Sequence, residues 1–475
     1  MLKVTFDRPW PLHGTAATRR IEQEAAASLP AHALMERAGL AVARLALAIA
    51  PHAHRVWVAC GPGNNGGDGL EAAVHLHRWG KAVTVTLAGS PDKLPPDAAN
   101  AWRKCREAGV PVADALPSAW DLGIDALLGL GSSRPLEDAL AAAAGRMSAS
   151  ASPVLAIDLP SGLNADTGNG QSVRAAHTVS LLTLKPGLFT GAGRDAAGEL
   201  WFDDLGVQAA EAPTAQLAGP APVRVRAHAS HKGLNGDVAV IGGAPGMAGA
   251  AVLAATSALC GGAGRVFLAP LDTGFGAAVP GWPELMVRAW DALPLESISV
   301  ACGCGGGDAV AAMLPAVLSR AKWLVLDADA LNAIAADASL QETLRRRGRP
   351  TVLTPHPLEA ARLLGTSTAQ VQGDRLRAAQ ELGERSKAVV VLKGSGTVIA
   401  APGTTPSINP TGNGRLATGG TGDVLAGLVA AALPVSSDAL QAAAHAVYRH
   451  GKAADDWPAG EPLTAGALAR RLHLD

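Results

Sequence analysis

The chain has 475 residues, which at about 150 residues per domain predicts two or three domains and excludes a peptide hormone or a single small binding module. Its 40 Lys and Arg residues balance 41 Asp and Glu residues, and the net charge of −1 excludes a general nucleic-acid coater, which needs a basic surface. With 48% hydrophobic but only 3% aromatic residues, the core is expected to be built from Ala, Val and Leu in a sheet-and-helix protein.

Cysteine usage and hydropathy indicate the compartment. The five cysteines are odd in number and include no C-x-x-C pair, which predicts free thiols in a reducing cytoplasm and no zinc site. The N-terminal sequence MLKVTFDRPWPLH does not have the pattern of a signal peptide. Apolar stretches are shorter than the roughly 18 residues that span a bilayer. We therefore expect a soluble, cytoplasmic protein without membrane or nucleic-acid partners.

The first half alternates between strand and helix patterns. A helix is predicted from Glu22 to Ala50, because apolar residues recur at helical spacing up to Pro51. A strand (RVWVACG), a tight loop (GPGNNGGDG), a helix (LEAAVHLHRW) and a strand (AVTVTLAG) follow. DLGIDALLGLG, an Ala-rich helix from Leu136 to Met147, PVLAIDLPSG and HTVSLLTLKPG continue the series. This order predicts a parallel sheet.

A Pro- and Ala-rich stretch at about 206–229 has no sustained period and marks a domain boundary. A second alternating series follows, through DVAVIGG, RVFLAP, SVACG, WLVLDADAL, TVLTPHP, AVVVLKG and TVIAA, to a helix after GGTGD. We therefore predict two tandem α/β domains at residues 1–212 and 229–475, joined by a linker at 213–228.

The loop after the first buried strand combines glycines with polar side chains. Residues 61–66 match G-x-G-x-x-G, but the next strand lacks the terminal acidic residue that holds a ribose in dinucleotide-binding proteins. A standard dehydrogenase is therefore disfavoured. Asn64, Asn65 and Asp68 instead offer oxygen ligands beside helix N-terminal amides, a combination that suits a cation together with a phosphate or ribose.

Two more strand ends carry polar groups. Asp125 lies in IDALLGLG, and Asp158 and Ser161 lie in AIDLPSG. Ligands of open α/β sheets bind outside the carboxyl ends of the strands, where these residues are expected to meet. Each aspartate alone is read as a turn cap. Together with the glycine-rich loop they predict a site.

The segment NPTGNGRLATGGTGDVLAG is the most specific part of the second half. Its glycines permit a tight turn, and a helix is predicted to begin at Thr421 to Asp423, where its first amides are exposed. The Asp423 carboxylate can take a proton from a hydroxyl. These are parts of a phosphoryl-transfer site. The alternative is an ordinary glycine-rich helix start with Asp as a cap. No G-x-x-x-x-G-K-[ST] is present, which excludes P-loop chemistry.

Three further segments support a nucleotide and substrate site. KGSGT at Lys393 to Thr397 could border a nucleotide, and His356 is fixed between prolines in TPHP. CGCGGGD at Cys302 to Asp308 ends a strand in glycines that allow a ligand to approach closely. We interpret Cys302 and Cys304 as buried small residues rather than nucleophiles.

Read together, these motifs resemble a known fusion of two enzymes. GPGNNGGDGL, DALLGLG and DLPSG resemble NAD(P)H-hydrate epimerase domains, which implies a Rossmann-like parallel-sheet domain. HKGLNGDVAVIGG, TPHPLEAARLLG, KGSGTVI and GNGRLATGGTGDVLAG resemble ribokinase-like NAD(P)H-hydrate dehydratase domains. The resemblance covers nearly the whole chain apart from the linker and the segment Leu271 to Leu295.

The resemblance implies that the first domain interconverts the R and S epimers of NADHX and NADPHX, the hydrated forms of NADH and NADPH. It implies a potassium site at Asn65, Asp125 and Ser161, and Asp158 is the candidate acid/base residue. The implied substrate contacts are Asn64, Asn65, Gly66, Gly67, Asp68, Gly129, Leu130, Gly131, Ser132, Ser133, Arg134, Pro135 and Asp158.

The second domain is expected to dehydrate the S epimer, with magnesium as cofactor and ADP as phosphoryl donor, forming NAD(P)H, AMP and phosphate. The implied nucleotide contacts are Lys393, Gly394, Ser395, Gly396, Thr397 and Gly422, and the implied hydrate contacts are Ala250, Gly305, His356 and Asp423, the last as general base. Two departures stand out: Leu358 replaces a frequent glycine after TPHP, and CGCGGG replaces the commoner GPGLG, which leaves Gly307 as an alternative to Gly305.

Two other functions compete with this interpretation. The second half could be a vitamin-precursor kinase, which would release a stable phosphorylated product. The first half could be a protein or RNA interaction module, against which its intact polar residues and the near-neutral charge argue. We also expect a homo-oligomer.

Overall fold

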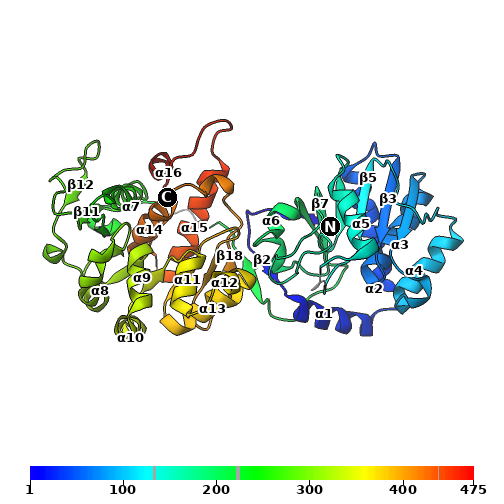
Figure 1. Ribbon diagram of the computed structural model, residues 1–475, viewed down its shortest axis with the longest axis horizontal. Helices are drawn as coiled ribbons and strands as arrows, with labels where there is room; N and C mark the ends of the chain where they lie inside the picture. The colour runs from blue at the N-terminus through cyan, green and yellow to red at the C-terminus, as the bar shows by residue number, and fades with distance from the viewer. Residues whose placement is uncertain (132–134, 221–224, 437, 475) are drawn as a thin grey trace. The chain divides into compact units, whose positions relative to one another are not determined.

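The computed structural model describes residues 1–131, 135–220, 225–436 and 438–474, and the chain divides into two compact units (Figure 1). The first unit comprises Met1–Thr5 and Trp10–Ala215, and the second comprises Phe6–Pro9 and Gln216–Asp475. The division after Ala215 falls inside the segment 213–228. None of the helices in these described ranges has the length and apolar character needed to cross a bilayer.

The first unit alternates strands and helices. Its strands are β1 (Leu2–Lys3), β2 (Trp10–Leu12), β3 (Arg55–Cys60), β4 (Ala82–Leu87), β5 (Leu122–Ala126), β6 (Val154–Ile157), β7 (His177–Leu181) and β8 (Glu199–Asp203). Its helices are α1 (Thr15–Ser28), α2 (Ala33–Ile49), α3 (Asn64–Arg78), α4 (Pro96–Glu107), α5 (Asp138–Ser148) and α6 (Gly193–Ala196).

The sheet of this unit has the order β1-β8-β7-β6-β5-β3-β4, and all its pairs are parallel except β1 with β8. The chain runs outward from β3 to β4 and then returns to the other side of β3 as β5. Such a reversal leaves a crevice at the carboxyl ends of the two strands, where ligands bind in open α/β sheets. The loops after β3 and β5 border that crevice.

Alternate residues of β3 face two cores, because successive side chains of a strand point to opposite faces of the sheet. Val56 and Val58 pack with α2, α3 and α4 on one face. Trp57 packs with α5 on the other, where its ring centroid lies 4.6 Å from that of Trp120. Helices on both faces of a parallel sheet confirm the predicted fold class.

Two predictions about helices in this unit are wrong. The helix expected from Glu22 to Ala50 is two helices, α1 and α2, because Pro30 lacks an amide donor and holds Leu29 in extended conformation. His32, with φ of 66°, then turns the chain into α2. The loop expected over GPGNNGGDG ends early, since α3 begins at Asn64 and contains the Asn-Asn-Gly-Gly-Asp run.

The second unit repeats the alternation. Its strands are β10 (Asp237–Gly242), β11 (Arg265–Pro270), β12 (Leu285–Val287), β13 (Ser299–Cys302), β14 (Trp323–Leu326), β15 (Thr351–Leu353), β16 (Val389–Leu392), β17 (Val398–Ala400) and β18 (Ser407–Ile408), and β9 (Ala215–Leu217) spans the division. Its helices are α7 (Ala248–Cys260), α8 (Leu314–Arg320), α9 (Ala328–Ala336), α10 (Ala338–Arg346), α11 (Pro357–Leu364), α12 (Thr368–Gly373), α13 (Arg375–Ser386), α14 (Thr421–Ala432), α15 (Ala439–Asp455) and α16 (Ala465–Arg471).

The sheet of the second unit runs β12-β11-β10-β13-β14-β15-β16-β17-β18, parallel from β12 to β16. Here the direction of winding reverses between β10 and β13. Helices α7, α14, α15 and α16 cover one face, and α8 to α13 cover the other. The α14 helix packs closely on α7, since a Cβ on Gly427 would lie 2.0 Å from the backbone oxygen of Ala254.

Candidate functional site

A cavity of about 760 Å³ lies in the first unit at the carboxyl ends of β3, β5 and β6. The predicted site residues that line it are Asn64, Asn65, Asp68, Gly129, Leu130, Gly131, Pro135 and Asp158. Gly66 and Gly67 face protein instead: a Cβ on Gly66 would lie 2.0 Å from Gly61 O, and one on Gly67 would lie 2.5 Å from Met35 Cε. The predicted contacts Ser132, Ser133 and Arg134 lie outside the described residues.

Asn65 and Asp158 converge on the loop after β5. A Cβ on Gly129 would lie 2.8 Å from Asn65 Oδ1 and 3.3 Å from Asp158 Oδ2, so glycine leaves room for both side chains. The Nδ2 atom of Asn65 is buried and meets no hydrogen-bond acceptor in the described part of the chain. An unsatisfied buried donor costs about 1–3 kcal/mol. The cavity therefore holds a donor that a bound ligand can satisfy.

Asp125 and Ser161 form a buried oxygen cluster. Ser161 donates from its amide to Asp125 Oδ2 (2.8 Å) and from its hydroxyl to Asp125 Oδ1 (2.6 Å). The Leu128 amide donates to the same hydroxyl at 2.8 Å. Burial raises the pKa of Asp125 to about 6 despite these hydrogen bonds. The two residues that the resemblance assigns to a cation are thus in direct contact.

Several polar residues of the cavity were missed by sequence reasoning, among them one lysine and three residues of α1. Lys185 is fully buried and forms an ion pair with Asp158. Helix α1 supplies the other three, Thr18, Arg19 and Glu22, to the cavity wall. Lys185 could have been found from the sequence, because it stands before Pro-Gly at the end of a predicted strand. The residues of α1 could not, because that helix carries no recognisable motif.

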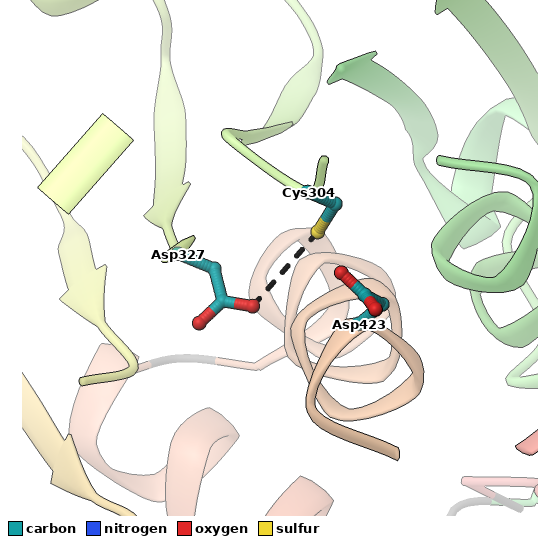
Figure 2. A group of neighbouring side chains, drawn as sticks. All are labelled: Cys304, Asp327 and Asp423. Atoms are coloured by element: carbon teal, nitrogen blue, oxygen red, sulfur yellow. Dashed lines mark hydrogen bonds between the residues drawn. The ribbon is translucent and has the colours of Figure 1, made fainter. Parts of the chain in front are cut away.

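In the second unit, Asp423 lies in the first turn of α14, after Gly420 with φ of 91°. Its carboxylate faces Cys304, from the loop after β13, and Asp327, from the end of β14 (Figure 2). One possible ligand atom from each residue lies within 4.8 Å of the other two. Burial, followed by the charge of Asp327, raises the pKa of Asp423 to about 6. Cys302 and Cys304 are buried, as predicted.

Asp327 connects this cluster to Lys393. Its Oδ1 accepts hydrogen bonds from Lys393 Nζ (2.7 Å) and from Thr354 Oγ1 (2.9 Å). Burial would lower the pKa of Lys393, but the charges of Asp327 and Glu359 outweigh it, and the pKa is raised. A Cβ on Gly422 would lie 3.3 Å from Lys393 Nζ. A charged ammonium therefore lies beside the α14 N-terminus. Sequence reasoning missed the hydrogen bonds that Asp327 accepts from Lys393 and Thr354.

A buried histidine anchors this turn. His450 Nε2 of α15 lies 3.0 Å from Thr421 O, and because a carbonyl only accepts, the ring donates. Burial lowers the pKa of His450 to about 4, which keeps the ring neutral at physiological pH. The first turn of α14 is therefore fixed from both the sheet side and the α15 side.

The Lys393 to Thr397 turn rests on Arg375. The Arg375 guanidinium donates to the backbone oxygens of Leu392 (3.1 Å) and Lys393 (3.2 Å), and burial lowers its pKa to about 10. Gly394 has φ of 142° and Gly396 has φ of 63°, conformations that favour glycine. The Thr397 hydroxyl donates to Gly394 O at 3.1 Å. The Arg375 side chain thus fixes the backbone at the start of this turn.

The predicted hydrate contacts come from three elements. Gly305 and Ala250 are adjacent, since a Cβ on Gly305 would lie 2.9 Å from the Ala250 Cβ. Gly307 donates its amide to Asp329 Oδ2 at 2.8 Å. His356 caps α11: its Nδ1 accepts from the amides of residues 358 and 359 at 3.1 and 3.3 Å. Its pKa is lowered by burial and by Lys393.

Comparisons with known proteins match a family to each half of the chain. A family described as NAD(P)H-hydrate dehydratase matches residues 238–473, and one described as YjeF-related protein N-terminus matches residues 31–187. The bifunctional NAD(P)H-hydrate repair enzyme of Escherichia coli is 36% identical over 464 residues, covering 92% of this chain and 88% of that protein. The enzyme of the same name from Vibrio cholerae is 38% identical and covers 94% of each.

Among solved structures, the ADP/ATP-dependent NAD(P)H-hydrate dehydratase of Bacillus subtilis, co-crystallized with ATP and Mg²⁺, is 33% identical. It covers 52% of this chain and 90% of that protein, with a TM-score of 0.45. The two full-length relatives, aligned through both units, decide the assignment. The chain belongs to the family of bifunctional NAD(P)H-hydrate repair enzymes.

Proposed function

We propose that the two units carry out successive steps in the repair of hydrated NADH and NADPH. The first unit interconverts the R and S epimers, and the second converts the S epimer and ADP into NAD(P)H, AMP and phosphate. The observation that carries the second assignment is the Asp423 carboxylate beside the N-terminal amides of α14 and the Lys393 ammonium.

The dehydration needs a better leaving group than hydroxide. Asp423 takes the proton of the ring hydroxyl as the hydroxyl oxygen attacks the β-phosphorus of ADP and AMP leaves. The α14 amides and Lys393 stabilise the charge on the transferring group. The ring nitrogen then expels phosphate, and loss of a proton from the neighbouring carbon restores the dihydronicotinamide. All atoms of the hydrate and ADP are accounted for in the three products.

We assign the nucleotide to the turn Lys393 to Thr397 and to Gly422, and the hydrate to Ala250, Gly305 and His356. The glycine-rich backbone of the turn, which Arg375 holds by hydrogen bonds, favours a nucleotide there, as does the closeness of Gly422 to Lys393. The contact between Ala250 and Gly305 favours a shared surface for the hydrate.

Magnesium fits the carboxylates of this cluster. Magnesium prefers oxygen ligands, so Asp423 and Asp327 suit it and the Cys304 thiol does not. The metal would supply positive charge against the nucleotide phosphates. Proton removal would remain with Asp423, and Lys393 and the α14 amides would stabilise the transferring group.

In the first unit, we assign proton transfer to Asp158 and a potassium ion to Asn65, Asp125 and Ser161. The donor set supports an alkali cation, because it consists of amide, carboxylate and hydroxyl oxygens with no imidazole or thiol. The ion would hold the substrate-binding loops in register.

We further propose a cytoplasmic location, since all five cysteines are free and four of them are buried. We also propose a homo-oligomer, which light scattering on the purified protein tests directly.

The decisive experiment incubates the purified protein with mixed NADHX epimers. With ADP, we expect complete recovery of NADH absorbance and one free phosphate for each NADH; without ADP, only epimer interconversion. ATP in place of ADP measures the donor preference. A stable phosphorylated product would instead identify a vitamin-precursor kinase, and absence of both reactions would leave the first unit as an interaction module.

A further inference from the structure

Lys185 is a buried cation inside the first unit's cavity. Its side chain is only 1% exposed, and its Nζ donates to Asp158 Oδ1, to Leu181 O (2.7 Å) and to Ser180 Oγ (3.4 Å). An ammonium has three donors, and each is used here. A buried ammonium is retained only beside an opposite charge, because desolvation of an unpaired one is costly. Lys185 is therefore placed to act on Asp158.

The two oxygens of Asp158 have different surroundings. Oδ1 accepts from Lys185 and, at 3.3 Å, from the Leu181 amide. Oδ2 accepts no hydrogen bond from the described residues and is directed at Gly129 in the cavity wall. The backbone of Asp158 has φ of 67°, a strained conformation for a residue other than glycine. The surroundings thus hold one oxygen and leave the other available to substrate.

A second carboxyl group, that of Asp68, lines the same cavity. Within the described residues it has no ion-pair partner. Burial raises the pKa of Asp68 well above its ordinary value, and nearby carboxyl groups raise it further. The charged groups around the two aspartates are Glu22 and Arg19 of α1, Asp97 of α4, Glu71 of α3 and Lys185. The buried Lys185 ammonium therefore balances the negative charge of Asp158, and no cation among the described residues pairs with Asp68.

We infer that Lys185 is a positioning residue that divides acid and base roles between two carboxyl groups: it holds Asp158 as the carboxylate that accepts a proton, and it leaves Asp68 as the carboxylic acid that donates one. The inference rests on the proposed epimerase activity.

The step balances without any further reactant. Asp158 takes the proton of the ring hydroxyl, and the oxygen's electron pair forms a carbonyl. The bond from that carbon to the ring nitrogen breaks with its pair left on nitrogen, and Asp68 protonates the nitrogen. Rotation of the carbonyl and reversal of both transfers close the ring as the opposite epimer and restore both carboxyl groups.

The test measures kcat and kcat/KM for epimer interconversion by chiral chromatography across pH 5 to 9. For Lys185→Met we expect the acid limb of the kcat profile to move to higher pH by about 1 to 3 units, the effect of losing an opposite charge at contact distance. Lys185→Arg is expected to return the limb toward its original position. For Asp68→Asn we expect kcat to fall by about 10² to 10⁴ with little change in KM.

Lys104→Met is the matched control. Lys104 also pairs with a buried carboxylate, that of Glu71 at 2.8 Å, but does not line the cavity. It is expected to lose stability while the acid limb of the kcat profile stays at its wild-type position. Circular dichroism and thermal unfolding of the same preparations report whether the first unit of each variant is folded, and dehydration of pure S epimer reports the second unit.

The outcomes separate this inference from the proposed function. If the wild-type protein does not interconvert epimers, the proposed function fails. If it does, while Lys185→Met keeps the wild-type pH profile or Asp68→Asn keeps the wild-type kcat, the division of roles is wrong. Should Lys185→Met not fold, Lys185→Gln takes its place with the same expected shift of the acid limb, and Asp68→Asn tests the proton donor independently.

Discussion

Replacing Asp423 by Asn tests the dehydration chemistry with the smallest possible change of shape. The amide keeps the size of the side chain and one acceptor oxygen, but it cannot take a proton from a hydroxyl. Loss of a general base typically lowers the rate by about 10² to 10⁴. We therefore expect kcat for dehydration of the S epimer to fall by that factor, while ADP binding and epimerisation persist.

The wild-type enzyme should also show a pH-dependent rate of dehydration whose size follows from the pKa of Asp423. The base is active when ionised, and burial raises the pKa of Asp423 to about 6. Such a group is roughly 9% ionised at pH 5 and roughly 91% ionised at pH 7, so dehydration should be about tenfold slower at the lower pH. The limb does not belong to His450, because burial lowers its pKa to about 4.

The assay follows NADH formation from pure S epimer at saturating ADP between pH 5 and 8, with ADP binding measured by calorimetry at each pH. Epimerisation in the same samples serves as the control for folding. Near-normal dehydration by Asp423→Asn would refute the mechanism. Loss of ADP binding in the variant would show that Asp423 supports the turn instead.

Three further predictions follow from the structure. Asp158→Asn should abolish epimerisation and leave dehydration of S epimer near normal, since each unit holds its own set of groups; joint loss in a folded variant would contradict this. Epimerisation should be faster in potassium than in sodium buffer, and equal rates would exclude a functional potassium site. Gly427→Ala should lower the free energy of unfolding by about 1–3 kcal/mol, because its Cβ would lie 2.0 Å from Ala254 O. Gly249→Ala, in the first turn of α7 with no heavy atom within 4 Å of its Cβ, should be neutral or slightly stabilising in the same chemical denaturation experiment.

Much of both sites could be predicted because parallel strands end at one edge of a sheet. That argument placed Asp125 and Asp158 near the loop after β3, and the structure brings the side chains of Asp158 and Asn65 together beside Gly129. The same argument applied to WLVLD would have found Asp327, whose importance lies in its contact with Lys393.

Other features depend on information that a local pattern does not carry. The Lys185 side chain became part of the site only through its ion pair with Asp158, a contact between two different strand ends. Helix α1 has no motif and was merged with α2 in the prediction, since the helical period continues on both sides of Pro30. His356 was expected to meet substrate, and its use of Nδ1 as a helix cap became visible only from the positions of two amides.

Helix α1 (Thr15–Ser28) precedes the residues by which the first unit is matched to its family, which begin at residue 31. Yet this helix supplies Arg19 and Glu22 to the cavity wall, and its Thr18 hydroxyl contacts that of Thr183 at 2.8 Å. A shortened chain that starts at residue 31 would keep every motif while one wall of the cavity opened to water. A domain boundary drawn from the motifs alone would therefore remove part of the cavity wall.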